Sequence, residues 1–193
     1  KPTVADVSQT IAPSTATTIS ITGTNFVSIP QVQFVNGSTG AITNANTVSF
    51  TNATTLSVNV TLASGNYYVR IENPDGNAGR STINIITAST APTFSTNAGS
   101  LGTFAGNFSG TIATIAGSSD SAVTFSEVGS NLTTANVTLS SAGVLATTDF
   151  GGSSTTPTQY NFTIRITDAE GQTADRAFSL TSSFGATGGA CFH

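Results

Sequence analysis

The side chains that most often carry out covalent or metal chemistry are scarce in this chain. Its single histidine, His193, and its single cysteine, Cys191, both fall among the last three residues. A nucleophilic serine or cysteine needs a base held beside it, and a zinc site needs several Cys or His ligands at set spacing. We therefore predict neither a catalytic triad nor a zinc centre. Without a second cysteine, Cys191 is expected to be a free thiol, with pairing to another chain as the alternative.

The carboxylates offer two further chemistries. Asp168 together with Glu170 or Asp149 could form the pair of carboxyl groups that hydrolyses glycosides. Asp120, Asp168 and Glu170 are candidate oxygen ligands for calcium. Asp168 and Glu170 fall where we expect an exposed hairpin turn without a substrate cleft, and the dense acidic runs of strong calcium sites are absent. We predict solvated turn residues, no enzyme activity, and no resident metal or cofactor.

Charge is sparse over the whole sequence. Only 7% of residues are charged, against about 25% in typical soluble proteins, while Ser and Thr make up about a third of the chain. A nucleic-acid interface needs clustered Lys and Arg, so we predict none. No apolar run approaches the ~20 residues of a membrane helix, and we predict no membrane span. We predict no signal peptide within the sequence. Because it lacks Met and begins with Lys1, we expect a processed product or a fragment.

Hydrophobic residues alternate with Ser, Thr, Gln and Asn through most of the sequence. A period of two is typical of half-buried strands in antiparallel sheets, and we find no helical stripe. The expected strands carry Ile19 and Ile21, Val32 and Phe34, Val48 and Phe50, Leu56 to Val60, Tyr67 to Ile71, Ile83 and Ile85, Val123 and Phe125, Val137 and Leu139, Tyr160 to Ile166, and Phe178 and Leu180.

One segment recurs. VRIENPDG at residues 69–76 returns as IRITDAEG at residues 164–171, an offset of 95, close to the ~100 residues of one immunoglobulin-like sandwich. Arg70 and Arg165 occupy the same position in the two copies of this segment, and the alternation predicts that both point away from the core. We predict an all-β chain of two tandem immunoglobulin-like antiparallel β-sandwiches. The boundary is placed in residues 87–93, giving domains 1–88 and 89–183 and a flexible tail, 184–193.

Particular motifs resemble known families. Residues 1–88 resemble an IPT/TIG domain through ISITGTNF (19–26), VQF (32–34) and GNYYVRIENPDG (65–76). Residues 89–183 are similar to the cadherin-like or putative-Ig modules of bacterial and phage surface proteins. Their motifs are APTF (91–94), SSAGVL (140–145) and YNFTIRITDAEGQTA (160–174).

The resemblance implies a spacer, an adhesive module or an assembly piece. We expect a non-enzymatic surface protein, foremost a virion component of a tailed phage that decorates the capsid or belongs to a fibre or tail. The alternative is a bacterial cell-surface or secreted adhesin module that binds glycans; a third reading is a carbohydrate-binding accessory domain using Tyr67, Tyr68 and Tyr160. Expected partners are structural subunits, copies of this chain within an assembly, or host-surface glycans and proteins, outside the cell or on a virion.

Overall fold

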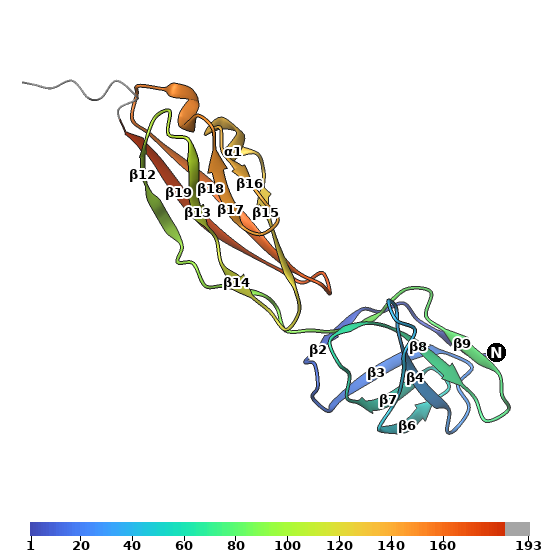
Figure 1. Cartoon of the computed structure of the whole chain (residues 1–193). Helices are drawn as coiled ribbons and strands as arrows, with labels where there is room; N and C mark the ends of the chain where they lie inside the picture. The colour runs from blue at the N-terminus through green and yellow to red at the C-terminus, as the bar shows by residue number, and fades with distance from the viewer. Residues whose placement is uncertain (184–193) are drawn as a thin grey trace, which may run out of the picture. The chain divides into compact units, whose positions relative to one another are not determined.

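A computed structural model describes residues 1–183, so the predicted tail, with Cys191 and His193, lies outside the described residues. The chain divides into two compact units, the first ending at Thr90 and the second beginning at Ala91. Each unit has its own cluster of buried hydrophobic residues. Figure 1 shows that both are built almost wholly of strands, which confirms the predicted all-β, immunoglobulin-like class.

The first unit is a sandwich of two sheets. The first sheet has the order β1 (Thr3–Val4), β3 (Thr17–Thr24), β7 (Thr55–Val60), β6 (Thr47–Asn52). The second sheet has the order β2 (Gln9–Ile11), β10 (Ile86–Ala88), β8 (Gly65–Glu72), β4 (Gln31–Asn36), β5 (Ile42–Asn44), with β9 (Ala78–Arg80) paired to β8.

Alternation in the sequence places one face of each of these sheets in the core. Phe34 on β4 and Leu56 on β7 are fully buried, as is Val69 on β8, while their neighbours along each strand are more exposed. Val48 and Phe50 are only partly buried, because β6 is an edge strand with a neighbour on one side only.

The strand predicted around Ile83 and Ile85 is wrong. Ile83 is 51% exposed and Ile85 is buried, and the strand begins one residue later, at Ile86. The preceding segment is bent by side-chain bonds: the Ser81 hydroxyl donates to the carbonyl of Ile83 (2.8 Å), and Asp6 accepts from the amide and hydroxyl of Thr82. Such bonds from a side chain to nearby main chain compete with a regular strand.

The second unit also packs sheets face to face. A four-stranded sheet has the order β12 (Gly99–Ala105), β19 (Thr173–Ser183), β18 (Thr158–Asp168), β15 (Val123–Val128). Opposite it are β13 (Gly110–Thr114), β17 (Val144–Thr147) and β16 (Thr138–Leu139). The smaller elements are the pair β11 (Thr93–Phe94) and β14 (Gly117–Ser118), helix α1 (Asn131–Thr134) and the 3₁₀ turn Phe150–Ser153.

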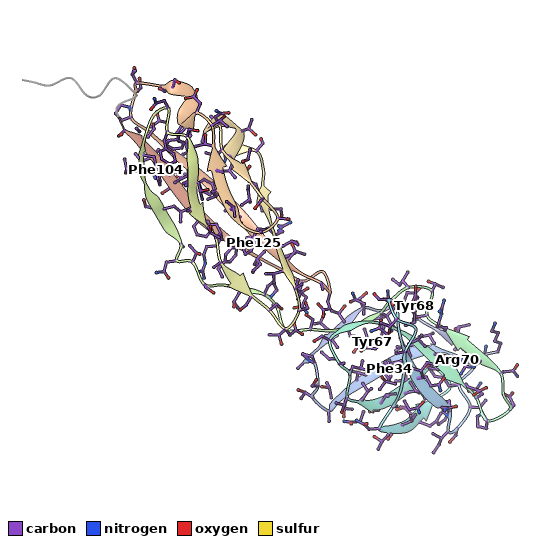
Figure 2. The ribbon with its side chains drawn as sticks, viewed as in Figure 1. Phe34, Tyr67, Tyr68, Arg70, Phe104 and Phe125 are labelled. Carbon is purple, nitrogen blue, oxygen red and sulfur yellow. The ribbon has the colours of Figure 1, made fainter. Side chains whose placement is uncertain are left out.

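Aromatic rings fill the core of the second unit. Phe162 and Phe178 stack with ring centroids 6.2 Å apart, and Phe94 meets Phe178 edge to face at 5.9 Å. Phe150 packs on Tyr160 at 5.7 Å. Such pairs contribute about 0.5–1.5 kcal/mol each beyond the area they bury. Figure 2 shows Phe104 and Phe125 within this unit and Phe34 within the first.

Each unit contains one parallel pair among its antiparallel ones, which the alternation does not predict. β2 lies parallel to β10 in the first unit, and β12 lies parallel to β19 in the second. In both cases an early strand of the unit pairs with the last one. The period of two indicates only which face of a strand is buried. It does not predict the order or the direction of the strands in a sheet.

The repeated segment folds in the same way in both units. In the first, the amide of Gly76 donates to the carbonyl of Asn73 (2.9 Å), and the amide of Asn73 donates to Asn77 (2.8 Å). In the second, Gly171 donates to Asp168 (3.1 Å) and Asp168 to Gln172 (3.0 Å). Both glycines have positive φ, +86° and +90°, a conformation that favours glycine. The two hairpins, β8–β9 and β18–β19, are therefore structurally equivalent.

Candidate functional site

The structure brings together the three predicted calcium candidates. Oxygen atoms of Asp120, Asp168 and Glu170 all lie within 4.8 Å of one another. Asp168 ends β18, Glu170 belongs to the turn that follows, and Asp120 lies just beyond β14. We call these three residues the carboxylate cluster. It lies at the end of the unit where the chain enters it, since β14 pairs with β11, which starts at Thr93.

Asp168 is not the exposed turn residue that was expected. Its exposed fraction is 5%, and its Oδ1 accepts hydrogen bonds from the amides of Glu170 (3.1 Å) and Gln172 (2.8 Å). The matching residue of the first unit, Asn73, is equally buried at 4%, and its side chain bonds the main chain of Val27 (3.0 Å). The side chain of Asp168 therefore holds its own turn, while that of Asn73 ties the hairpin to the segment at Asn25 and Val27. An Asn or Asp just before a turn is the sequence signal that could have indicated it.

Serine hydroxyls surround the other carboxylates. Ser121 donates to Glu170 (2.5 Å) and accepts from the amide of Ala169 (3.1 Å), while Ser119 donates to Asp120 (2.8 Å). Calcium takes six to eight oxygen ligands, and three carboxylates would supply only part of such a shell. The expectation that the cluster holds no metal stays a prediction.

Removal of the Asp168 carboxylate should loosen the hairpin. Asp168→Ala is expected to lower the free energy of unfolding of the second unit by about 1–3 kcal/mol, because two turn amides lose their acceptor. Asp168→Asn, which installs the amide found at Asn73, should recover most of that loss. Chemical denaturation of the three proteins without calcium measures both effects, and equal stability of the Ala and Asn variants would contradict the anchoring role.

The second carboxylate pair is not assembled. Asp149 lies next to Phe150, and the ring of Phe150 packs on Tyr160. Tyr160 and Asp168 lie toward opposite ends of β18. At the rise of a strand, these two residues are roughly 26 Å apart. Paired carboxyl groups of glycosidases lie roughly 5–10 Å apart. Asp149 instead accepts a hydrogen bond from Ser153 (2.6 Å), so it supports the 3₁₀ turn.

The two repeated arginines lie on outward-facing sheet surfaces, as predicted. Arg165 makes two hydrogen bonds with Asp175 across β18 and β19, at 2.8 and 2.9 Å, and these hold the pKa of the Asp175 carboxyl below its usual value. Arg70 donates to Gln33 (3.1 Å) and lies 3.7 Å from Glu72. Both guanidinium groups are thus engaged within their own units.

The three tyrosines considered for sugar stacking are occupied by other contacts. Tyr67 is buried, and its hydroxyl donates to the carbonyl of Ala63 (2.7 Å). The guanidinium of Arg80 covers the ring of Tyr68, 4.1 Å from its centroid. Tyr160 contacts Phe150, as described above. Figure 2 labels Tyr67 and Tyr68 in the first unit.

Comparison with known proteins finds likeness in structure alone. No family model and no curated protein matches the chain. Solved structures similar to it include extracellular cadherin domains 1–4 of protocadherin gamma B7 (13% identity, TM-score 0.41, covering 94% of this chain and 50% of that one). Mouse cadherin-23 EC22–24 is 15% identical (TM-score 0.41, 94% and 64%), and Drosophila OTK extracellular domains 3–5 are 16% identical (TM-score 0.45, 93% and 59%).

The chain therefore spans half to two thirds of these solved chains. Such identities and TM-scores are too low to transfer a function from these proteins to this one. In the part of the chain that the structure describes, no helix has the length and hydrophobicity needed to cross a membrane.

Proposed function

We propose that this chain is a non-enzymatic structural module of an extracellular surface, and specifically a virion component of a tailed phage that decorates the capsid or belongs to a fibre or tail. The observation that carries the proposal is two sandwich units, each with its own core, in a chain of which only 7% of residues are charged. Neutral Ser, Thr, Asn and Gln side chains cover the strands. Such surfaces suit contacts between packed subunits, where charges would have to be desolvated.

The local geometry also supports an IPT/TIG-like first unit. In the GTNF segment, Asn25 adopts a positive φ of 63°, and Phe26 is buried in the core. A Cβ on Gly23, near the end of β3, would lie 2.0 Å from the carbonyl oxygen of Thr3, so the close approach of β1 requires glycine there. The proposed partners are other structural subunits, including further copies of this chain, or host-surface glycans and proteins.

The repeated hairpin favours a second candidate, a bacterial adhesin module. Equivalent turns 95 residues apart, with the same hydrogen bonds, are expected of a unit that has been duplicated. This candidate predicts a longer gene with further copies of the unit and a surface anchor.

Mass spectrometry of purified particles from the source separates the two candidates. We expect peptides of this chain in the particle fraction at a stoichiometry fixed relative to the capsid protein. Their absence from particles, together with their presence in a cell-wall or secreted fraction, would contradict the virion assignment and favour the adhesin.

A further inference from the structure

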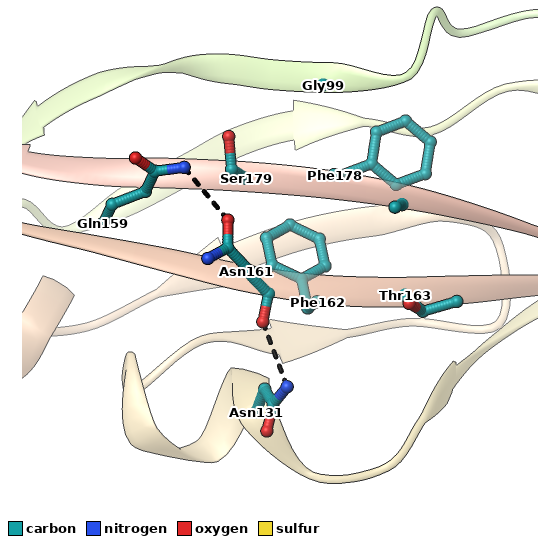
Figure 3. Close-up of a pocket in the computed structure, with 9 residues that line it drawn as sticks. Gly99, Asn131, Gln159, Asn161, Phe162, Thr163, Phe178 and Ser179 are labelled. Atoms are coloured by element: carbon teal, nitrogen blue, oxygen red, sulfur yellow. Dashed lines mark hydrogen bonds between the residues drawn. The ribbon is translucent and has the colours of Figure 1, made fainter.

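A shallow groove crosses the outer face of the four-stranded sheet in the second unit. Its volume is about 440 Å³, within the roughly 300–1,000 Å³ of ligand sites. It lies over β18 and β19 and beside α1, as Figure 3 shows. The polar side chains that line it are Asn131, Gln159, Asn161, Thr163 and Ser179.

Strand register explains why these side chains share one surface. Asn161 pairs with Ser179, and Thr163 pairs with Ala177; directly opposite residues of neighbouring strands project from the same face. Gln159 lies two residues before Asn161 and so projects with it. Asn131 comes from α1, and its Nδ2 donates to the carbonyl of Asn161 (3.1 Å), which holds the helix against this side of the groove.

Hydrogen bonds within the groove orient its amides and leave part of their capacity unused. Gln159 Nε2 donates to Asn161 Oδ1 (3.0 Å), drawn as a dashed line in Figure 3. Each amide offers two N–H donors and one carbonyl acceptor. Within residues 1–183, the Nδ2 of Asn161, the Oε1 of Gln159 and the Oδ1 of Asn131 have no protein partner. The groove therefore presents donors and acceptors side by side.

None of the residues lining the groove is charged. On the outward face of β18 and β19 the charged residues are Arg165 and Asp175, which pair with each other through two hydrogen bonds. The carboxylate of Glu127, close to α1, accepts from the amide of Leu132 (3.0 Å). A charged ligand would lose hydration here without meeting an opposite charge, at a cost in free energy. A matching ligand is therefore neutral and rich in groups that both donate and accept.

We propose that this groove binds a neutral oligosaccharide. Sugar hydroxyls both donate and accept hydrogen bonds, which matches adjacent amide and hydroxyl side chains. A second depression of about 190 Å³ adjoins the first, because it shares Asn131, Gln159 and Asn161 and adds Thr134 and Tyr160. The combined surface extends from β18 across α1 to Thr134, which favours a chain of sugars over a single ring.

A peptide fits this surface less well. Extended peptides usually bind by adding a strand to a free sheet edge. β19 lies between β12 and β18. On the other side of β18 the pairing with β15 ends at Thr163, and beyond it the main-chain carbonyl of Asn161 accepts from Asn131 (3.1 Å). The groove lies over the face of the sheet, where amide and hydroxyl side chains make the contacts.

The test is an array of neutral glucans, mannans and galactans beside acidic glycans, followed by calorimetry with the best neutral ligand. The protein is made in a bacterial host, because Asn131 and Asn161 each begin an Asn-x-Thr sequon that a glycosylating host would modify. In an NMR titration the side-chain NH₂ signals of Asn131, Gln159 and Asn161 should shift.

Asn161→Ala is expected to weaken binding about tenfold, from the loss of one or two hydrogen bonds. Ala177→Tyr should abolish it, since Ala177 is exposed on the groove surface and a ring there fills the space. The matched control is Asn44→Ala, which removes an exposed amide that accepts from Gln33 (3.2 Å) in the first unit and should leave binding unchanged. Unaltered melting temperatures show that each variant is folded.

The proposal would be overturned if the protein bound only acidic glycans, or if it bound no glycan at millimolar concentration. It would also be overturned if neither groove variant changed the affinity, or if the protein selectively captured peptides. The inference is independent of the virion assignment, which is tested on particles. A negative array leaves that result untouched.

Discussion

Phe34→Ala is expected to destabilise the first unit by about 3–5 kcal/mol, the range for truncating a buried Phe to Ala, and to leave the second unit unchanged. Phe34 is fully buried in β4, and all its companions in the core cluster belong to residues 4–88. The cavity left behind cannot be relieved by residues of the other core. Hydrogen exchange read by mass spectrometry follows the two units separately, which matters because the chain has no Trp to report on either.

The control for this variant is Ile42→Ala. Ile42 is 58% exposed on edge strand β5, and surface substitutions of this kind usually change stability by no more than about 0.5 kcal/mol. If Phe34→Ala accelerated exchange equally in both units, the two cores would not be independent, and the division at Thr90 would lose its energetic meaning.

Gly143→Ala should have the second largest effect, a loss of about 2–4 kcal/mol from the second unit. Gly143 has a φ of +89°, and a Cβ placed on it would lie 2.3 Å from the carbonyl oxygen of Ile115. The obstacle is main chain held in place, because the Ile115 amide donates to the Gly143 carbonyl (2.8 Å). Relief therefore requires displacement of the bonded segment.

Gly129 provides the matched comparison. Its φ is +93°, but nothing lies within 4 Å of a Cβ built there. Gly129→Ala should cost about 1 kcal/mol, from the backbone conformation alone. Thermal denaturation gives the loss of stability for each variant, and the difference between the two losses is the steric contribution at Gly143. Similar losses of stability would show that the contact with Ile115 is readily relaxed.

The sequence predicts most of the strands because the buried face of each sheet requires it. The apolar residues of each strand must point inward, and they therefore recur at every second position in the sequence. Examples are Val32 and Phe34 in β4 and Ile164 and Ile166 in β18. The alternation does not predict the structure at Ile83, where hydrogen bonds made by the side chains of Ser81 and Asp6 bend the chain. Asp6 and Thr82 are far apart in the sequence, and the bond from Ser81 to Ile83 depends on a side-chain position that hydrophobic alternation does not record.

Only part of the candidate site can be predicted from the sequence. The acidic residues of the carboxylate cluster are conspicuous in a chain with so few charges, and the structure does bring them together. The burial of Asp168 depends on the turn amides that it bonds, which composition does not reveal. The groove depends on the register of Asn161 with Ser179 and on the position of Asn131, and register is a property of the folded sheet.

The parallel pairing of an early strand with the last strand has a mechanical consequence. When two parallel strands are pulled apart from the leading end of one and the trailing end of the other, they slide along each other. The hydrogen bonds between β2 and β10, and between β12 and β19, then bear the load together instead of opening one after another. Tension that reaches these strands after β1 or β11 has been pulled away meets this shear geometry in both units.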